Sequence, residues 1–319
     1  MKKMLILIAL ILIITMVMPL VVVKLPIVNE EEEVIENAIA SDKVKVYIKN
    51  EDRVEEMDSM QYLKEVVSAE MPADFHEEAL KAQAVAARTY LVNRRRLPAT
   101  DIHKGADICT DSAHCKAWIK ESERRESWGN MAEENWQKIS DAVEKTDGII
   151  ITYEGEPISA VFHSTSSGVT ENAIDVWGGS VPYLVSVESL SDKESPKYSS
   201  EQSFSIDEFK KLSEEKIEGV DWNKGLFSDI YRSGAGGIIK IKIGGVEVKG
   251  TEFRNIFSLR STNVSIKEEE GKVFMSVKGY GHGVGMSQYG ANYLAYEGKN
   301  YIEILKTYYT GVEVKNVYE

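Results

Sequence analysis

One carboxyl group lies where it could act as a general acid. Glu70 lies between Ala69 and Met71, at the predicted C-terminal end of a helix. The negative end of the helix dipole and the apolar neighbours both disfavour an ionised carboxylate, so we expect its pKa to be raised. A raised pKa suits a general acid that works near neutral pH. The competing interpretation is a solvent-exposed glutamate at an ordinary helix end.

Two loops of small residues offer further polar groups to a ligand. The first, residues 162–168, follows a predicted strand and contains His163, Ser164, Ser166 and Ser167. Its hydroxyls could hydrogen-bond a polyhydroxylated ligand, although an ordinary turn with a packed histidine fits the same residues. A Ser-His hydrolase would use these residue types too, but the chain has no G-x-S-x-G elbow.

The second loop, residues 279–291, begins with four alternating glycines. Glycines let backbone amides approach a ligand or one another closely, and the loop also holds His282, Gly283, Ser287 and Gln288. The lysine of a phosphate-binding loop is missing, so a nucleotide site is not indicated. We expect a tight loop that holds His282 at a cleft, followed by a helix that begins near Ser287.

A third segment combines ligands that suit a soft metal. Its four donors are His103, Cys109, His114 and Cys115, all within thirteen residues. Two thiolates and two imidazoles fit a tetrahedral zinc site, and ligands from one loop would make that zinc structural rather than catalytic. A disulfide between the two cysteines is the alternative, because an extracytoplasmic compartment allows it and the common C-x2-C spacing is absent.

Hydrophobic patterns indicate the elements that must position these groups. We expect strands over 44–48, 238–243 and 273–277, and a hairpin of 148–153 with 158–162. We expect helices from 61 to about 70, from about 75 through 88, over 130–146 and over 206–216, and a last helix after Ser287. The segment 190–230 is interpreted as peripheral.

The N-terminus carries a long apolar run. Residues 5–23 contain no charge and lie between Lys2 and Lys3 on one side and Lys24 on the other. Such a run can cross a hydrocarbon core of about 30 Å, and the paired lysines favour a cytoplasmic N-terminus. We therefore expect an uncleaved membrane anchor over 1–24. A cleaved signal peptide is the alternative, but no Ala-x-Ala site follows the run.

Composition limits what the rest of the chain can be. The 319 residues are 43% hydrophobic, enough for a core, and their net charge of −13 argues against nucleic-acid binding. Residues 25–60 begin with an acidic run and are interpreted as a linker with one strand, and 61–319 as the domain that carries the chemistry. The expected class is α+β: a transmembrane helix, then an extracytoplasmic mixed α/β ectodomain with a substrate cleft.

Three strings in one order resemble the stage II sporulation protein D family, peptidoglycan lytic transglycosylases of endospore-forming bacteria. The resemblance runs from about Tyr62 to Tyr309. It rests on E-M-P and L-K-A-Q-A-V-A-A-R-T-Y between 70 and 90, on H-S-T-S-S-G, V-W-G-G and P-Y-L between 163 and 184, and on G-H-G-V-G-M-S-Q at 281–288. The apolar N-terminal run agrees with the anchor of that family.

This resemblance implies cleavage of peptide-free glycan strands between N-acetylmuramic acid and N-acetylglucosamine, which leaves 1,6-anhydro ends. Glu70 matches the family's catalytic glutamate, which acts as acid and then as base, so a second carboxylate is not needed. Some members have a similar His/Cys cluster, which favours zinc at 103–115. The matching strings imply a substrate-binding role for Arg88, His163, Ser164, Ser166, Ser167, Tyr183, His282, Gly283, Ser287 and Gln288.

The resemblance also implies partners and a location. The partners are stage II sporulation protein P, an amidase, and stage II sporulation protein M, a membrane protein of the same engulfment machinery. The location is the cell membrane at the sporulation septum, with a single span and the ectodomain outside the cytoplasm. The competing class is an anchored, non-catalytic protein that binds cell-wall glycan or serves as a septal scaffold.

Overall fold

The computed structural model describes residues 42–98, 100–112 and 114–318. No helix within these ranges is long and apolar enough to span a bilayer. The expected anchor, residues 1–24, and the first part of the acidic linker, 25–41, lie outside the described residues.

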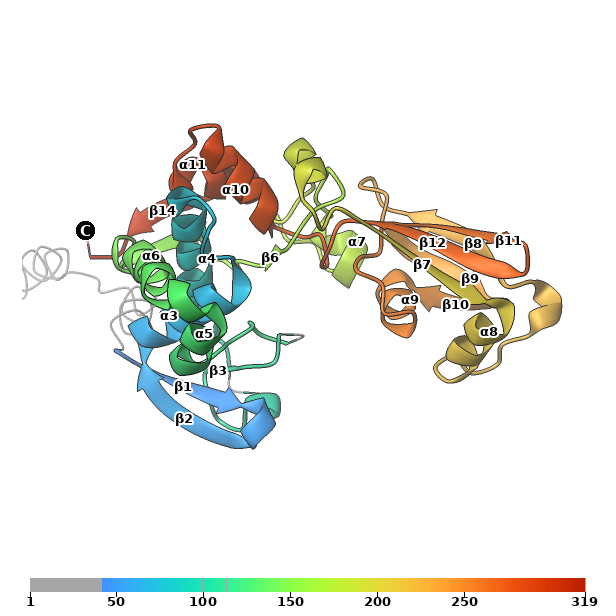
Figure 1. Ribbon diagram of the computed structural model, residues 1–319, viewed down its shortest axis with the longest axis horizontal. Coiled ribbons are helices and arrows are strands. Elements are labelled where there is room, and N and C mark those ends of the chain that lie inside the picture. Colours follow the sequence, from blue (N-terminus) through green and yellow to red (C-terminus); the bar gives the residue numbers. More distant parts are fainter. Residues whose placement is uncertain (1–41, 99, 113, 319) are drawn as a thin grey trace, which may run out of the picture. The chain divides into compact units, whose positions relative to one another are not determined.

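Helices and strands follow one another in mixed order, as expected for the α/β part of the fold class (Figure 1). The α-helices are α3 (Ser59–Glu70), α4 (Glu77–Arg96), α5 (Glu121–Trp128), α6 (Ala132–Glu144), α7 (Ala173–Trp177), α8 (Ile206–Glu214), α9 (Gly250–Ile256), α10 (Gln288–Tyr296) and α11 (Tyr301–Tyr308). The strands are β1 (Lys43–Ile48), β2 (Arg53–Asp58), β3 (Ile108–Cys109), β4 (Ile149–Tyr153), β5 (Glu156–Pro157), β6 (Phe162–His163), β7 (Ser199–Ser205), β8 (Phe227–Arg232), β9 (Ile238–Ile243), β10 (Val246–Lys249), β11 (Val264–Glu269), β12 (Lys272–Lys278), β13 (Met286–Ser287) and β14 (Glu313–Asn316). Short 3-10 helices are η1 (Lys49–Glu51), η2 (Asp101–His103), η3 (Gly129–Met131), η4 (Leu190–Glu194) and η5 (Trp222–Lys224).

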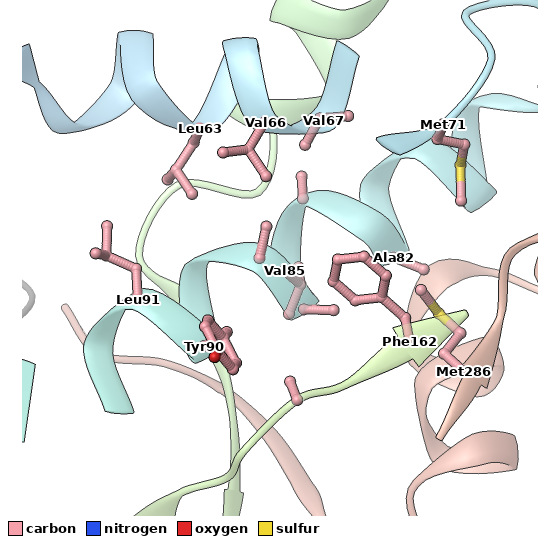
Figure 2. Packing of buried hydrophobic residues seen from close by; sticks show 14 of the residues in the cluster. Leu63, Val66, Val67, Met71, Ala82, Val85, Tyr90, Leu91, Phe162 and Met286 are labelled. Atoms are coloured by element: carbon pink, nitrogen blue, oxygen red, sulfur yellow. The ribbon is translucent and has the colours of Figure 1, made fainter. Parts of the chain in front are cut away.

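Helix α4 lies at the centre of the first hydrophobic core. It contacts α3, α6, α10, α11 and β4. The small side chains of Ala82, Ala84 and Ala86 have no exposed surface, so neighbouring elements pack directly on the helix. Figure 2 shows side chains of α3 pointing toward α4, with Phe162 and Met286 beside Ala82. The alanine-rich sequence of α4 therefore brings elements from distant parts of the chain together.

The facing ends of α3 and α4 lie where the sequence predicted them. The Asp58 side chain accepts a hydrogen bond from the Gln61 N–H and caps the start of α3. Helix α3 ends at Glu70 because Met71 is extended before a proline. Helix α4 begins after His76, whose Nδ1 accepts from the Glu78 N–H. Glu70 is thus held at a helix end beside the central helix.

The segment assigned to a linker contains two strands rather than one. Strands β1 and β2 pair antiparallel, and β1 also pairs parallel with β3. Val44, Val46 and Ile48 of β1 belong to the first core. The second strand was missed because Arg53–Asp58 is mostly charged and exposed, so it lacks a buried face.

The predicted hairpin after α6 is only partly correct. Strand β4 pairs antiparallel with β5, which is only Glu156–Pro157, and with β14 from the C-terminus. The expected return strand over 158–162 does not form. Phe162 and His163 instead pair in parallel with Met286 and Ser287. This β6–β13 pair joins the two loops that the sequence singled out.

A second hydrophobic core is built from residues within 199–278. It contains the three-stranded sheets β11-β12-β7 and β10-β9-β8, together with α8 and α9. The ring of Phe209 on α8 stacks on Phe257, with centroids 4.8 Å apart. The helix predicted from 206 is confirmed, but the interpretation of 190–230 as merely peripheral is wrong, since β7 and β8 lie there. Their polar, serine-rich or charged residues concealed the strand pattern.

Candidate functional site

The carboxyl group of Glu70 is held by groups from two other segments. Its Oε1 accepts a hydrogen bond from the Ala117 N–H at 2.7 Å. Burial raises the pKa of Glu70, and this effect outweighs the opposing effects of Lys116, the Ala117 N–H and the Gln288 side chain. The side chain remains partly exposed. The expected direction of the pKa shift is therefore confirmed, and Glu70 is exposed enough to meet a ligand.

Lys116 is a buried cation beside Glu70 that sequence reasoning missed. Its Nζ lies 3.8 Å from the ring centroid of Phe162 and 4.1 Å from that of Tyr90. Burial lowers the pKa of Lys116 to about 8, against the attraction of the Glu70 carboxyl group. A lysine between a cysteine and an alanine carries no pattern of its own. The only indication of its importance in the sequence was its position directly after Cys115, a candidate metal ligand.

The four soft ligands come together as the sequence predicted. The donor atoms of His103, Cys109, His114 and Cys115 all lie within 4.8 Å of one another. His103 Nε2 is 3.1 Å from His114 Nδ1 and 3.2 Å from Cys115 Sγ, and His114 Nδ1 is 3.5 Å from Cys109 Sγ. Tetrahedral zinc with ordinary bond lengths places such donors about 3.3–3.8 Å apart. The two cysteines are not bonded to each other, and the donor set fits zinc.

This cluster is directly continuous with the surroundings of Glu70. Cys115 is one of the four donors, Lys116 follows it, and Ala117 donates to the Glu70 carboxylate. The cluster crosslinks this loop, and the loop therefore determines where Lys116 and Ala117 lie relative to Glu70.

The two glycine- and serine-containing loops meet at the β6–β13 pair. Gly285 has a φ of +71°, and a Cβ there would run into the Val161 carbonyl oxygen. At Gly281, with φ +115°, a Cβ would lie 2.7 Å from the Cβ of His163. The alternating glycines are thus needed for close approach between the loops. Gly283 belongs to the same approach, since its carbonyl accepts from the Glu171 N–H at 2.8 Å.

Of the two histidines of these loops, His163 is buried and His282 is partly buried. Burial lowers the pKa of His163 to about 4 and holds that of His282 well below its ordinary value. His163 Nδ1 lies 3.1 Å from the Val284 carbonyl oxygen, which can only accept, so Nδ1 carries the proton. The two rings are 5.7 Å apart, and the Trp177 ring is 5.2 Å from His282. This arrangement suits packing and hydrogen bonding rather than proton transfer near neutral pH.

Asp192 joins the two loops, and no motif in the chain pointed to it. Its Oδ2 accepts from the Ser166 Oγ at 2.5 Å and from the Ser166 N–H at 3.1 Å. Its Oδ1 accepts from the Ser287 Oγ at 2.7 Å. Both serine side chains are buried. Ser166 and Ser287 therefore belong to a buried supporting network, whereas Ser164 is partly exposed.

The remaining predicted residues divide between the site and the scaffold. Gln288 begins α10, lies within 3.4 Å of Gln83, and hydrogen-bonds the Glu70 carboxyl group. The Tyr183 hydroxyl accepts from the Ser159 N–H at 3.0 Å, and the Ser167 hydroxyl lies 3.3 Å from the Ala235 carbonyl oxygen. These contacts give Tyr183 and Ser167 partners within the fold.

Arg88 is buried against the C-terminal end of α6. Its guanidinium donates to the carbonyl oxygens of Thr146 and Val143, at 2.6 and 2.9 Å. Both carbonyls belong to the C-terminal end of α6 and the turn after it, where a cation is favourable. The structure therefore gives Arg88 a partner in the fold rather than in the site.

Comparison with known proteins decides the family. The family model described as stage II sporulation protein (SpoIID) matches residues 47–153. Stage II sporulation protein D of Bacillus amyloliquefaciens is 39% identical over 271 residues, which cover 85% of this chain and 78% of the relative. The protein of that name from Bacillus subtilis (strain 168) is 38% identical, with the same coverage. The chain belongs to the stage II sporulation protein D family.

Membership of this family supports a role in sporulation. A more distant relative in Bacillus subtilis (strain 168), described as amidase enhancer, is 31% identical over 300 residues and is matched over 39% of its length. The family model covers Glu70, Arg88 and the four-ligand cluster, and it ends before the two loops. The longer matches to the two sporulation proteins extend over most of the chain.

Proposed function

We propose that this protein is a lytic transglycosylase that cleaves peptide-free glycan strands between N-acetylmuramic acid and N-acetylglucosamine. Glu70 carries the proposal, since it combines a raised pKa, partial exposure and support from Ala117 and Gln288. Protonated Glu70 donates its proton to the glycosidic oxygen as the bond to C1 of N-acetylmuramic acid breaks. The resulting carboxylate then takes the proton of the C6 hydroxyl, whose oxygen bonds to C1 and closes the 1,6-anhydro ring.

A single carboxyl group suffices for this sequence of steps. The other carboxylate of α3, Glu65, is buried and already accepts hydrogen bonds from Trp118 Nε1, Gln61 Nε2 and the Glu121 N–H. The carboxylate oxygens of Glu65 therefore already have hydrogen-bond partners within the fold. Lys116 and the Ala117 N–H stabilise the carboxylate once the proton has left.

Substitution of Glu70 by glutamine tests this proposal. The amide keeps the shape and can still accept from the Ala117 N–H, but it cannot donate the acidic proton. Wild-type protein should release anhydro-ended fragments from peptide-free glycan, and the folded Glu70→Gln variant should release none. The matched control is Glu65→Gln on the same helix. Equal release by the Glu70 variant would remove Glu70 from the mechanism, and no release by wild type would favour the glycan-binding or scaffold role.

We also propose that His103, Cys109, His114 and Cys115 hold one structural zinc ion. When bound, the ion would crosslink the loop through four protein ligands and leave no position for a substrate. The short distances among the donors support this assignment. Metal analysis of purified protein, with His103→Ala and Cys109→Ser variants, tests it. Metal-free wild type with a measured disulfide would end it.

The proposed setting is the sporulation septum. We propose that residues 1–24 anchor the chain as one span with the ectodomain outside the cytoplasm, and that stage II sporulation proteins P and M are partners. Membrane fractionation with and without 1–24 tests the anchor, and co-purification from sporulating cells tests the partners. A chain without 1–24 that still sediments with membranes would contradict the anchor.

A further inference from the structure

A pocket lies beside α7, and Val176, Trp177 and Gly178 of the V-W-G-G string are among its lining residues. Its volume of about 470 Å³ falls within the range of small-molecule sites, about 300–1,000 Å³. One wall comes from Glu171 and from α7, including Trp177, and the other from β9, β10 and the start of α9. None of the groups that hold the Glu70 carboxylate lines it. The pocket is therefore separate from the surroundings of Glu70.

Trp177, the last residue of α7, presents an aromatic face at this pocket. Its side chain is 50% exposed although it is large and apolar. Its ring lies 5.2 Å from that of His282, which belongs to the second glycine-containing loop. An exposed aromatic ring at a pocket is a surface on which the apolar face of a sugar ring can stack. The pocket thus adjoins the candidate site through His282.

The polar groups of the pocket suit a neutral ligand with many hydroxyls. Glu171 is buried, and its Oε1 accepts from the Gly237 N–H at 3.1 Å. The other oxygen, Oε2, has no hydrogen-bond partner among the described residues and almost no exposed surface, and burial raises the pKa of Glu171 against a hydrogen bond from the Ser233 side chain. Lys240 pairs with Glu247 at 3.0 Å, so this part of the wall selects no ion. Lys249 and Asp175 add one charge of each sign.

We propose that this pocket is a second saccharide subsite, which takes an N-acetylhexosamine unit of the glycan strand that Glu70 acts upon. This inference rests on the proposed function. The sugar ring stacks on Trp177, and its hydroxyl and acetamido groups hydrogen-bond the polar lining of the pocket, to which Glu171, Asp175 and Lys249 belong. Affinity then depends on strand length, because a short oligosaccharide cannot occupy both the subsite and the surroundings of Glu70.

Binding of chitobiose and chitohexaose, measured by calorimetry in the Glu70→Gln background, tests this subsite without turnover. In that background, Trp177→Ala should weaken chitohexaose binding about tenfold, as expected for the loss of one aromatic stacking partner. Glu171→Gln should weaken chitohexaose binding several-fold, and its amide oxygen can still accept the hydrogen bond from the Gly237 N–H. Tyr296→Ala, which removes another exposed aromatic ring, is the matched control and should change nothing. Thermal unfolding checks that each variant is folded.

The outcomes separate this inference from the proposed function. Undetectable chitohexaose binding by the Glu70→Gln protein, or equal binding by folded Trp177→Ala and Glu171→Gln variants, overturns the subsite. If wild type cleaves glycan while those variants bind normally, the subsite fails and the function stands. If wild type cleaves nothing while Trp177→Ala still loses chitohexaose binding, the glycan-binding subsite stands and the function fails.

Discussion

Replacing Arg88 with alanine should destabilise the fold rather than weaken substrate binding selectively. The guanidinium is buried and donates to the Val143 and Thr146 carbonyls at 2.9 and 2.6 Å. Each charged hydrogen bond contributes about 1.5–3 kcal/mol, and the alanine variant leaves buried carbonyls without that donor. We therefore expect a loss of about 3–5 kcal/mol in the free energy of unfolding.

Thermal and urea unfolding followed by circular dichroism measure this loss. At about 2–4 °C per kcal/mol for a domain of this size, the unfolding temperature should fall by about 6–20 °C. Arg88→Lys keeps a charge but only one compact donor group, so it should fall between wild type and the alanine variant. At a temperature where Arg88→Ala is folded, its KM should equal that of wild type. An unchanged unfolding temperature with a raised KM would refute this reasoning and place Arg88 at the substrate.

Three further predictions follow from the site. Glu70 must be protonated to act as an acid, and its pKa is raised. We therefore expect kcat/KM to fall as the pH rises through this pKa, at a higher pH than for an ordinary glutamate. A fall at the ordinary glutamate pKa would contradict this. Asp192→Ala leaves the buried donors of Ser166 and Ser287 unpaired. In urea unfolding it should lower the free energy of unfolding by about 3–5 kcal/mol, whereas Asp192→Asn should lower it by about 1–2 kcal/mol. Equal losses for the two variants would argue against the network. A strong chelator should remove about one zinc per chain and lower the unfolding temperature, and Cys115→Ser should do the same without chelator; an unfolding temperature insensitive to both would argue against a structural metal.

Local pattern predicted the elements that hold Glu70. Pro72 ended α3 at the expected residue, and the alanine-rich sequence marked α4 as the helix on which others pack. The four soft ligands could be predicted because they lie close together in the chain, so that one loop brings them together.

What the sequence could not predict are contacts between distant segments. Asp192 receives hydrogen bonds from serines 26 and 95 positions away, and nothing near it in the chain indicates this. The second core escaped detection because β7 and β8 are polar and because their pairing partners lie later in the chain. The family strings pointed to Arg88 as a substrate-binding residue. Its role in the fold became visible only through its hydrogen bonds to the carbonyl oxygens at the end of α6.

If Glu70 acts as proposed, the C6 hydroxyl attacks C1 within the same sugar, and water does not hydrolyse the bond. Mass spectrometry of products formed from peptide-free glycan in isotopically labelled water tests this most directly. We expect 1,6-anhydro ends that contain no label, and no such ends from the Glu70→Gln variant. Reducing ends that carry the label, or anhydro ends produced equally by that variant, would contradict it.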